Sequence, residues 1–352
     1  MITHSATLAA NEQIRARIAA GEDIIHLAFG EAGLPVHPDL AACLNGSAHR
    51  TDYPAVVGDQ AAREACAGYF ERRGMRTEAS QIVLAPGSKA LLYATLLAVP
   101  GDVVLPKPSW VSYAAQAALA GRGTLSVPIP AHTGGVPDPD LLAEALDRAE
   151  REGRRPGSLI LTRPDNPTGT IADDETLKQV CEIAASHDLV VISDEIYADL
   201  SHDGAAGYPV SAATLIPERT VVTTGLSKRL ALGGWRIGVA RIPDGPLRNE
   251  LIGIGSEIWS SMAAPMQDVA RYAFDEPEEL TSYIDRARRL HSSVAHAMWR
   301  VWTDAGAQCR EPEGGFYIYP DLGAFADRLA SRDIATSPRL AEALLDVGQV
   351  GV

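Results

Sequence analysis

Seven short apolar runs recur between residues 81 and 242, and this recurrence constrains the fold more than any other feature of the sequence. The runs are IVLA, VVLP, LSVPI, SLILT, LVVIS, VVTT and IGVARI. Helical patterns separate them, over Ser88–Val99, Ser112–Ala120, Asp138–Glu152 and Asp173–Ser186. Strands that alternate with helices predict an α/β domain, in which seven mostly parallel strands form one sheet flanked by helices.

The rest of the chain reads as helix-rich. We expect a single helix over Ser256–Phe274, a long charged helix over Glu278–Asp304, a strand over Gly314–Asp321 and a helix over Pro338–Val347. The long helix could leave the sheet and lead into a smaller α+β domain built from both termini. The predicted divisions are an N-terminal segment (1–40) that joins the small domain, a large ligand-binding domain (41–280) and an incomplete small domain (281–352).

Composition excludes several classes of function. A formal net charge of −14 argues against nucleic-acid partners, since phosphate backbones are held by clustered Lys and Arg. The longest apolar stretch, Ala90–Val99, is too short to cross a bilayer, and the N-terminus has no signal pattern, so we expect a cytoplasmic protein without membrane contacts. The four cysteines lie far apart without metal-ligand spacing, which predicts free thiols and no metal site.

Polar and glycine-containing segments follow the apolar runs, and five of them carry candidate functional residues. They are LAPGSK with Gly87, Ser88 and Lys89; KPSWVSY with Trp110; RPDNPTGT with Asn166; ISDEIY with Asp194 and Tyr197; and GLSKRLALGGWRIG with Ser227, Lys228 and Arg236. Open α/β sheets bind ligands at the carboxyl ends of their strands. A strand followed by Gly and a helix offers free N–H groups to an anion, and the planar fork of an arginine can grip two phosphate oxygens.

The segment from Gly225 to Gly238 is similar along its whole length to the lysine signature of the class I/II aminotransferases, the aspartate aminotransferase-like enzymes of fold type I. The resemblance covers nearly the whole chain, from HLAFGEAG to GGFYIYPD. It implies that Lys228 holds pyridoxal 5′-phosphate (PLP) as a Schiff base. It also implies a double-displacement reaction, in which the amino group of an amino acid passes to a 2-oxo acid.

The resemblance also implies roles for the other candidates. Asp194 would bond the pyridine nitrogen, while Asn166 and Tyr197 would donate to the ring's phenolic oxygen and Trp110 would stack on the ring. The implied phosphate ligands are Gly87, Ser88, Lys89, Ser227 and Arg236, with Tyr53 reaching the phosphate from the neighbouring subunit of a homodimer. Gly30 and Asn166 are the implied substrate-binding residues.

One departure from the family pattern lies at the C-terminus. In the family, the chain goes on from a point like GQVGV to an arginine that clamps the substrate's α-carboxylate, whereas here no arginine follows Arg339 and the sequence ends at Val352. We therefore expect PLP binding with weak transamination. Two alternatives stay open at this point: another fold type I PLP enzyme (a C–S lyase, decarboxylase or synthase), and a non-catalytic PLP-binding protein.

Overall fold

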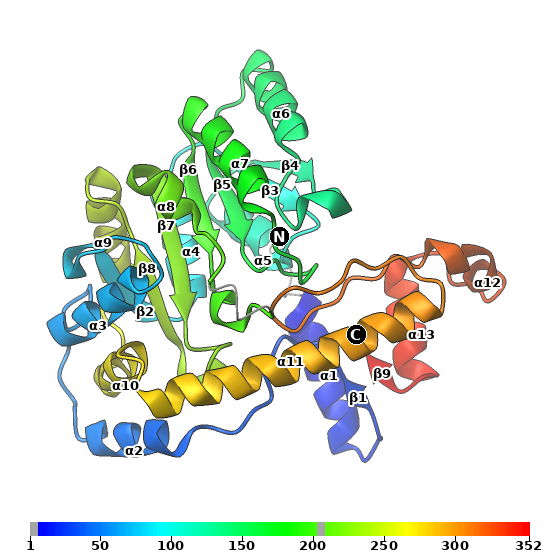
Figure 1. Cartoon of the computed structure of the whole chain (residues 1–352), viewed down its shortest axis with the longest axis horizontal. Coiled ribbons are helices and arrows are strands. Elements are labelled where there is room, and N and C mark those ends of the chain that lie inside the picture. The colour runs from blue at the N-terminus through cyan, green and yellow to red at the C-terminus, as the bar shows by residue number, and fades with distance from the viewer. Residues whose placement is uncertain (1–5, 203–207) are drawn as a thin grey trace.

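The computed structural model describes residues 6–202 and 208–352, and a seven-stranded sheet forms its centre (Figure 1). The strand order is β2-β8-β7-β6-β5-β3-β4. All strands run in one direction except β8, which is antiparallel to both of its neighbours. The bounds are β2 Ile82–Pro86, β3 Asp102–Lys107, β4 Thr124–Pro128, β5 Pro156–Thr162, β6 Val190–Asp194, β7 Thr220–Gly225 and β8 Ile237–Arg241. The predicted mostly parallel sheet is confirmed.

Helices bury both faces of the sheet, which explains why its strands read as continuous apolar runs. In β5, for example, Ile160 packs toward one face, while Leu159 and Leu161 pack toward the other. The first face is covered by α4 Ser88–Ala98, α5 Val111–Leu119 and α9 Pro246–Ile258. The second is covered by α3 Gln60–Glu71, α6 Pro139–Arg151, α7 Asp174–Ser186, α8 Ala212–Leu215 and α10 Ala264–Phe274, with α2 Pro38–Ser47 packed on α10.

The expectation of one helix over Ser256–Phe274 is wrong. Helix α9 ends at Ile258, and α10 begins at Ala264. Ser260 lies in the left-handed region with φ of 57°, and Pro265 stands at the start of α10, where its missing N–H is tolerated. A proline inside a continuous helix would clash with the preceding turn, so the chain breaks before it.

The long helix α11 runs from Glu278 to Asp304, as predicted, and leaves the sheet at its α10 end (Figure 1). The chain then folds back toward the sheet. The strand expected over Gly314–Asp321 is wrong, because this segment makes only two isolated bridges, Ser201 to Gly314 and Gln308 to Asp321. Its backbone instead bonds to loops: Gly314 N–H donates to the Gly169 carbonyl and Gly315 N–H to the Leu200 carbonyl.

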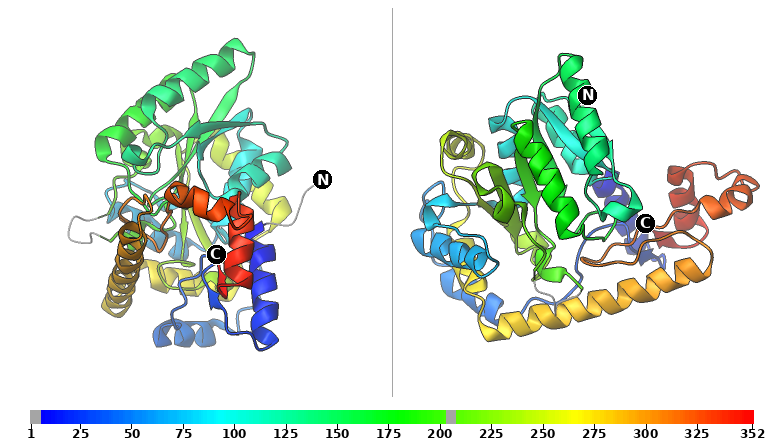
Figure 2. Two further views of the ribbon diagram at one scale, coloured as in Figure 1. Left: turned by 90° about the vertical axis from the view of Figure 1, so that its right-hand side faces the viewer. Right: turned by 45° about the horizontal axis from the view of Figure 1, so that its top comes forward.

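The two ends of the chain meet in a small unit beyond the sheet. Strand β1 Ile25–His26 pairs in parallel with β9 Val350–Gly351, and Figure 2 shows α1 Ala6–Ala19 close to α13 Ser337–Asp346. An apolar cluster of Ile14, Ile24 and Leu345 joins them. The helix predicted over Pro338–Val347 is thus present, within one residue at each end. The domain limits themselves stay a prediction, and residues 1–5 of the N-terminal segment lie outside the described residues.

The remaining elements are short. They comprise α12 Ala326–Ala330 and the 3-10 turns Ala79–Gln81, Ala131–Thr133, Ala198–Leu200, Pro217–Arg219, Gly233–Trp235 and Gly323–Phe325. Within residues 6–202 and 208–352, no helix is long and apolar enough to cross a bilayer.

Candidate active site

The predicted site residues of the large domain lie at one edge of the sheet. Gly87, Trp110, Asn166 and Lys228 each stand shortly after the carboxyl end of a strand, and Asp194 is the last residue of β6. Arg236 directly precedes β8, and because β8 runs opposite to its neighbours its start lies at the same edge. The topology therefore brings residues separated by up to 149 positions to the same edge of the sheet.

Lys228 lies in the turn after β7, and its amine donates a hydrogen bond to the Gly30 carbonyl oxygen. Burial lowers the pKa of the Lys228 amine to about 8, against the opposing attraction of the Asp194 and Glu31 carboxylates. The neighbouring positive charge of Arg236 lowers this pKa further. A lysine in this state is neutral for a large part of the population near pH 8, as a nucleophilic amine must be.

Asp194 is 3% exposed and accepts hydrogen bonds from neutral donors, the Tyr113 hydroxyl at 2.9 Å and the Thr223 hydroxyl at 3.3 Å. Burial raises the pKa of its carboxyl to about 6, since these hydroxyl bonds only partly replace hydration. No ion pair within 4.0 Å reaches Asp194 in the part of the chain that the structure describes. A buried carboxylate held in this way suits a partner that brings its own N–H and positive charge.

A second tyrosine joins Asn166 and Tyr197. The Asn166 amide nitrogen lies 3.4 Å from the Tyr197 hydroxyl and 3.5 Å from the hydroxyl of Tyr317, and the two hydroxyls are 2.7 Å apart. Burial raises the pKa of Tyr317 to about 12, so both phenols are neutral. Sequence reasoning missed Tyr317, because its segment was taken for a strand and carried no signal for a place in the site.

The loop between β2 and α4 meets Arg236 at close range. Gly87 has φ of 91°, and a Cβ there would collide with the Arg236 guanidinium, so this position requires glycine. Helix α4 begins at Ser88 with neither a side-chain cap nor an acidic residue in its first turn. Arg236 donates to the Gly233 carbonyl at 3.0 Å and forms no ion pair among the described residues. An uncapped helix N-terminus beside a guanidinium that has no carboxylate partner can hold an anion such as phosphate.

Further predicted residues lie around this cradle. The Lys89 amine is 4.7 Å from the centroid of the Trp110 ring, and burial together with Arg236 lowers the pKa of that amine. The Trp110 ring packs edge-on against Tyr113, the donor to Asp194, at 5.3 Å between centroids. Ser227 is half-buried beside Lys228. Tyr53, in contrast, is 92% exposed and is not brought to the site of its own chain.

A buried ion network behind the site was also missed by sequence reasoning. Arg229, directly after Lys228, is 1% exposed and pairs with Asp199 at 3.1 Å and with Glu276 at 3.2 Å. Arg73 pairs with the same two carboxylates, at 2.5 and 2.6 Å. Because Asp199 belongs to the turn that carries Tyr197, the network ties that turn to the Lys228 turn.

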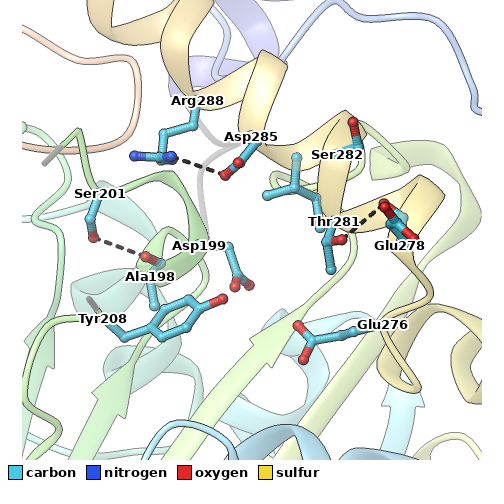
Figure 3. Close-up of a pocket in the computed structure, with 11 residues that line it drawn as sticks. Ala198, Asp199, Ser201, Tyr208, Glu276, Glu278, Thr281, Ser282, Asp285 and Arg288 are labelled. Atoms are coloured by element: carbon cyan, nitrogen blue, oxygen red, sulfur yellow. Dashed lines mark hydrogen bonds and ion pairs between the residues drawn. The ribbon is translucent and has the colours of Figure 1, made fainter. Parts of the chain in front are cut away.

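A cavity of about 360 Å³ opens beside this network, between Tyr208 and α11 (Figure 3). Asp199 and Glu276 form part of its wall, with Glu278, Thr281 and Arg288 along α11. None of the predicted cofactor-binding residues lines it. The cavity therefore does not include the predicted residues around Lys228.

The site matches the needs of a flat, anionic aldehyde cofactor. Lys228 offers an amine of lowered pKa, Asp194 offers a buried acceptor with no ion pair within 4.0 Å among the described residues, and the α4 N-terminus with Arg236 offers positive partial and full charge to an anion. These three features stand at the ends of different strands, at the same edge of the sheet. Their donor and acceptor types fit the aldehyde, ring nitrogen and phosphate of PLP.

Comparison with known proteins points to one family. The model of the family "Aminotransferase class I and II" matches residues 23–350. A probable aspartate/prephenate aminotransferase of Thermus aquaticus is 30% identical over 95% of this chain and 88% of its own length, and an aspartate aminotransferase of Geobacillus stearothermophilus is 30% identical over 100% and 88%. The solved aspartate aminotransferase from Thermus thermophilus with maleate superposes with a TM-score of 0.90 at 27% identity, covering 100% of this chain and 88% of that one.

Proposed function

The chain belongs to the class I and II aminotransferases, and on that premise we propose that it moves an amino group from an amino acid to a 2-oxo acid with PLP bound at Lys228. The observation that carries the proposal is the half-buried Lys228 amine, whose pKa burial lowers to about 8. The family match disfavours the lyase, decarboxylase, synthase and non-catalytic alternatives. PLP, when bound, supplies an electron sink that stabilises negative charge at the substrate α-carbon.

Each part of the cofactor has a proposed partner in this chain. Lys228 would link to the aldehyde carbon, Asp194 would bond the ring nitrogen, and Trp110 would lie against the ring. Asn166 and Tyr197 would hold the phenolic oxygen. The phosphate would be held by Gly87, Ser88, Lys89, Ser227 and Arg236. The lack of a cap and of acidic residues at the α4 N-terminus supports this last assignment.

The protein's own groups divide the work of the reaction. Tyr113 and Thr223 donate hydrogen bonds to the Asp194 carboxylate, which would accept a hydrogen bond from the ring nitrogen of PLP and favour its protonated form. As a free amine, Lys228 would take the proton from the substrate α-carbon, and a lowered pKa suits an amine for that task. Gly30, whose carbonyl meets Lys228, and Asn166 are the proposed substrate contacts.

We also propose a cytoplasmic homodimer in which Tyr53 reaches the partner's phosphate site. Tyr53 is 92% exposed in the loop before α3, so its ring is available to a second copy. Light scattering of the purified protein measures the oligomeric state. Tyr53→Phe should weaken PLP binding without changing that state, and a monomer would contradict the shared site.

The central test replaces Lys228. Lys228→Ala should abolish both the visible absorption band of protein-bound PLP and its trapping on the protein by borohydride. Lys178→Ala, whose side chain is 52% exposed on α7, should leave both unchanged. An unchanged band in Lys228→Ala would overturn the assignment.

Turnover is then measured with a panel of amino acids and 2-oxo acids. Aspartate is tested first, because the relatives are named aspartate aminotransferases. In transamination the amino acid is released as a 2-oxo acid, and its amino group appears on the second substrate. This pair of products distinguishes the reaction from lyase or decarboxylase chemistry. The same assay measures whether turnover is weak, as the sequence led us to expect.

A further inference from the structure

Tyr317 occupies a place in the site that the proposed function does not use. It lies in the segment between α11 and α12, which folds back toward the sheet (Figure 1). Its hydroxyl is 2.7 Å from that of Tyr197 and 3.5 Å from the amide nitrogen of Asn166. These are the two groups proposed to hold the phenolic oxygen of PLP. The hydroxyl oxygen of Tyr317 therefore contacts Tyr197 and Asn166, the same two groups that are proposed to contact the phenolic oxygen of a bound PLP.

The other neighbours of Tyr317 also belong to the site. A Cβ at Gly30 would collide with the Tyr317 hydroxyl and would lie 3.7 Å from the Lys228 amine, so both groups lie against the same side of Gly30. The Tyr317 ring packs edge-on against the Tyr197 ring, with centroids 5.4 Å apart. The phenol is thus placed among the cofactor and substrate contacts rather than in the apolar core.

The backbone that carries Tyr317 is attached firmly to the large domain. The N–H groups of Glu313 and Gly314 both donate to the Gly169 carbonyl, in the Asn166 loop. Gly315 N–H donates to Leu200, in the Tyr197 turn. The two ring nitrogens of His202 face the Pro312 and Gly315 carbonyls, at 3.1 and 2.9 Å. With its backbone held at these points, the Tyr317 hydroxyl leaves the site most readily by rotation of the side chain.

We propose that the Tyr317 hydroxyl occupies the phenolic-oxygen position of the PLP site and that PLP must displace it to bind. Tyr317 is then a side-chain gate that competes with one atom of the cofactor. Its hydroxyl lies 2.7 Å from the Tyr197 hydroxyl and 3.5 Å from the Asn166 amide nitrogen, so the phenolic oxygen of PLP would have to replace these two contacts. This inference rests on the proposed function, because it takes PLP as the cofactor.

The test compares PLP with 3-deoxypyridoxal phosphate, the analogue without the ring hydroxyl. Both are titrated into cofactor-free wild type, Tyr317→Phe and Tyr319→Phe, and binding is followed by absorption and by equilibrium dialysis. Tyr319 is 53% exposed in the same segment and is the matched control. Tyr317→Phe should bind PLP roughly 3- to 10-fold more tightly, the effect of one hydrogen-bonded group that no longer has to be displaced.

The analogue makes the result specific to one oxygen. Because it places no hydroxyl between Tyr197 and Asn166, its affinity should be equal in wild type and in Tyr317→Phe, and Tyr319→Phe should match wild type for both ligands. An unchanged or weaker affinity of Tyr317→Phe for PLP overturns the gate, as does an equal gain for PLP and the analogue. If wild type and every variant fail to bind PLP, the proposed function itself is refuted. The two failures are distinguishable, because wild type still binds PLP when only the gate is wrong.

Discussion

The substitution Asp194→Asn should stabilise the cofactor-free protein while it removes the group that holds the ring nitrogen. Asp194 is 3% exposed, and burial raises the pKa of its carboxyl from 3.8 to about 6. At neutral pH the folded chain must therefore keep a buried negative charge, which the hydroxyls of Tyr113 and Thr223, the backbone at Ile196 and the positive charge of Lys228 only partly offset. An asparagine keeps an oxygen acceptor for these hydroxyls and carries no charge.

The size and sign of the effect follow from this pKa. Because the folded-state pKa lies above the unfolded value, the folded chain binds the proton more tightly, and the contribution of Asp194 to stability falls as the pH rises from about 4 to about 6. Above that window the penalty is constant at about 3 kcal/mol, from about 1.4 kcal/mol for each pKa unit. For a chain of 352 residues this corresponds to about 4 °C in Tm.

The assay is a thermal melt of cofactor-free wild type and Asp194→Asn between pH 4 and pH 8. Asp304→Asn, at the exposed end of α11, is the control for loss of one negative charge. The Tm of Asp194→Asn should be higher than that of wild type at pH 8 and equal to it at pH 4. Addition of PLP should raise the Tm of wild type far more than that of the variant. Equal melting temperatures at pH 8, or a less stable variant there, would refute the reasoning.

Three further outcomes are expected. The rate at which Lys228 captures PLP should rise with pH through about 8, because burial lowers the pKa of its amine and the neutral form reacts; stopped-flow absorption that is flat from pH 6.5 to 9.5 would contradict this. Arg236→Ala should weaken PLP binding roughly 10- to 100-fold and leave binding of unphosphorylated pyridoxal unchanged, as measured by titration, whereas equal losses would argue against a phosphate contact. Arg229→Met should lower the free energy of unfolding by about 3–5 kcal/mol in urea, since it leaves the Asp199 carboxylate short of a buried partner, and Arg300→Met on the exposed face of α11 should change it little.

Local patterns predicted much of the fold because each of them reports its own surroundings. Strands buried on both faces read as apolar runs, and all seven were found. The long helix was predicted with its observed ends, Glu278 and Asp304. Where local pattern failed, tertiary bonding had replaced it: the GGFYIYPD segment resembles a strand, yet its N–H groups donate to the Gly169 and Leu200 loops.

The sequence by itself determined the chemistry and the order of the proposed site. A lysine after one strand, an aspartate at the end of another and a glycine before a helix are features of short segments, and a parallel sheet places such segments at one edge. Lys228, Asp194, Asn166 and Gly87 all lie at that edge. Their proximity to one another depends only on the direction and order of the strands.

Only the tertiary structure decided which distant groups enter the site. Tyr317 lies 120 positions from Tyr197, yet their hydroxyls are hydrogen-bonded. The reason is that the segment after α11 forms backbone hydrogen bonds with the loops that follow β5 and β6. Gly30 reaches Lys228 across 198 positions from the N-terminal side. The physical reason is that such contacts depend on how separate elements pack, and packing is a property of the whole chain rather than of any short segment of it.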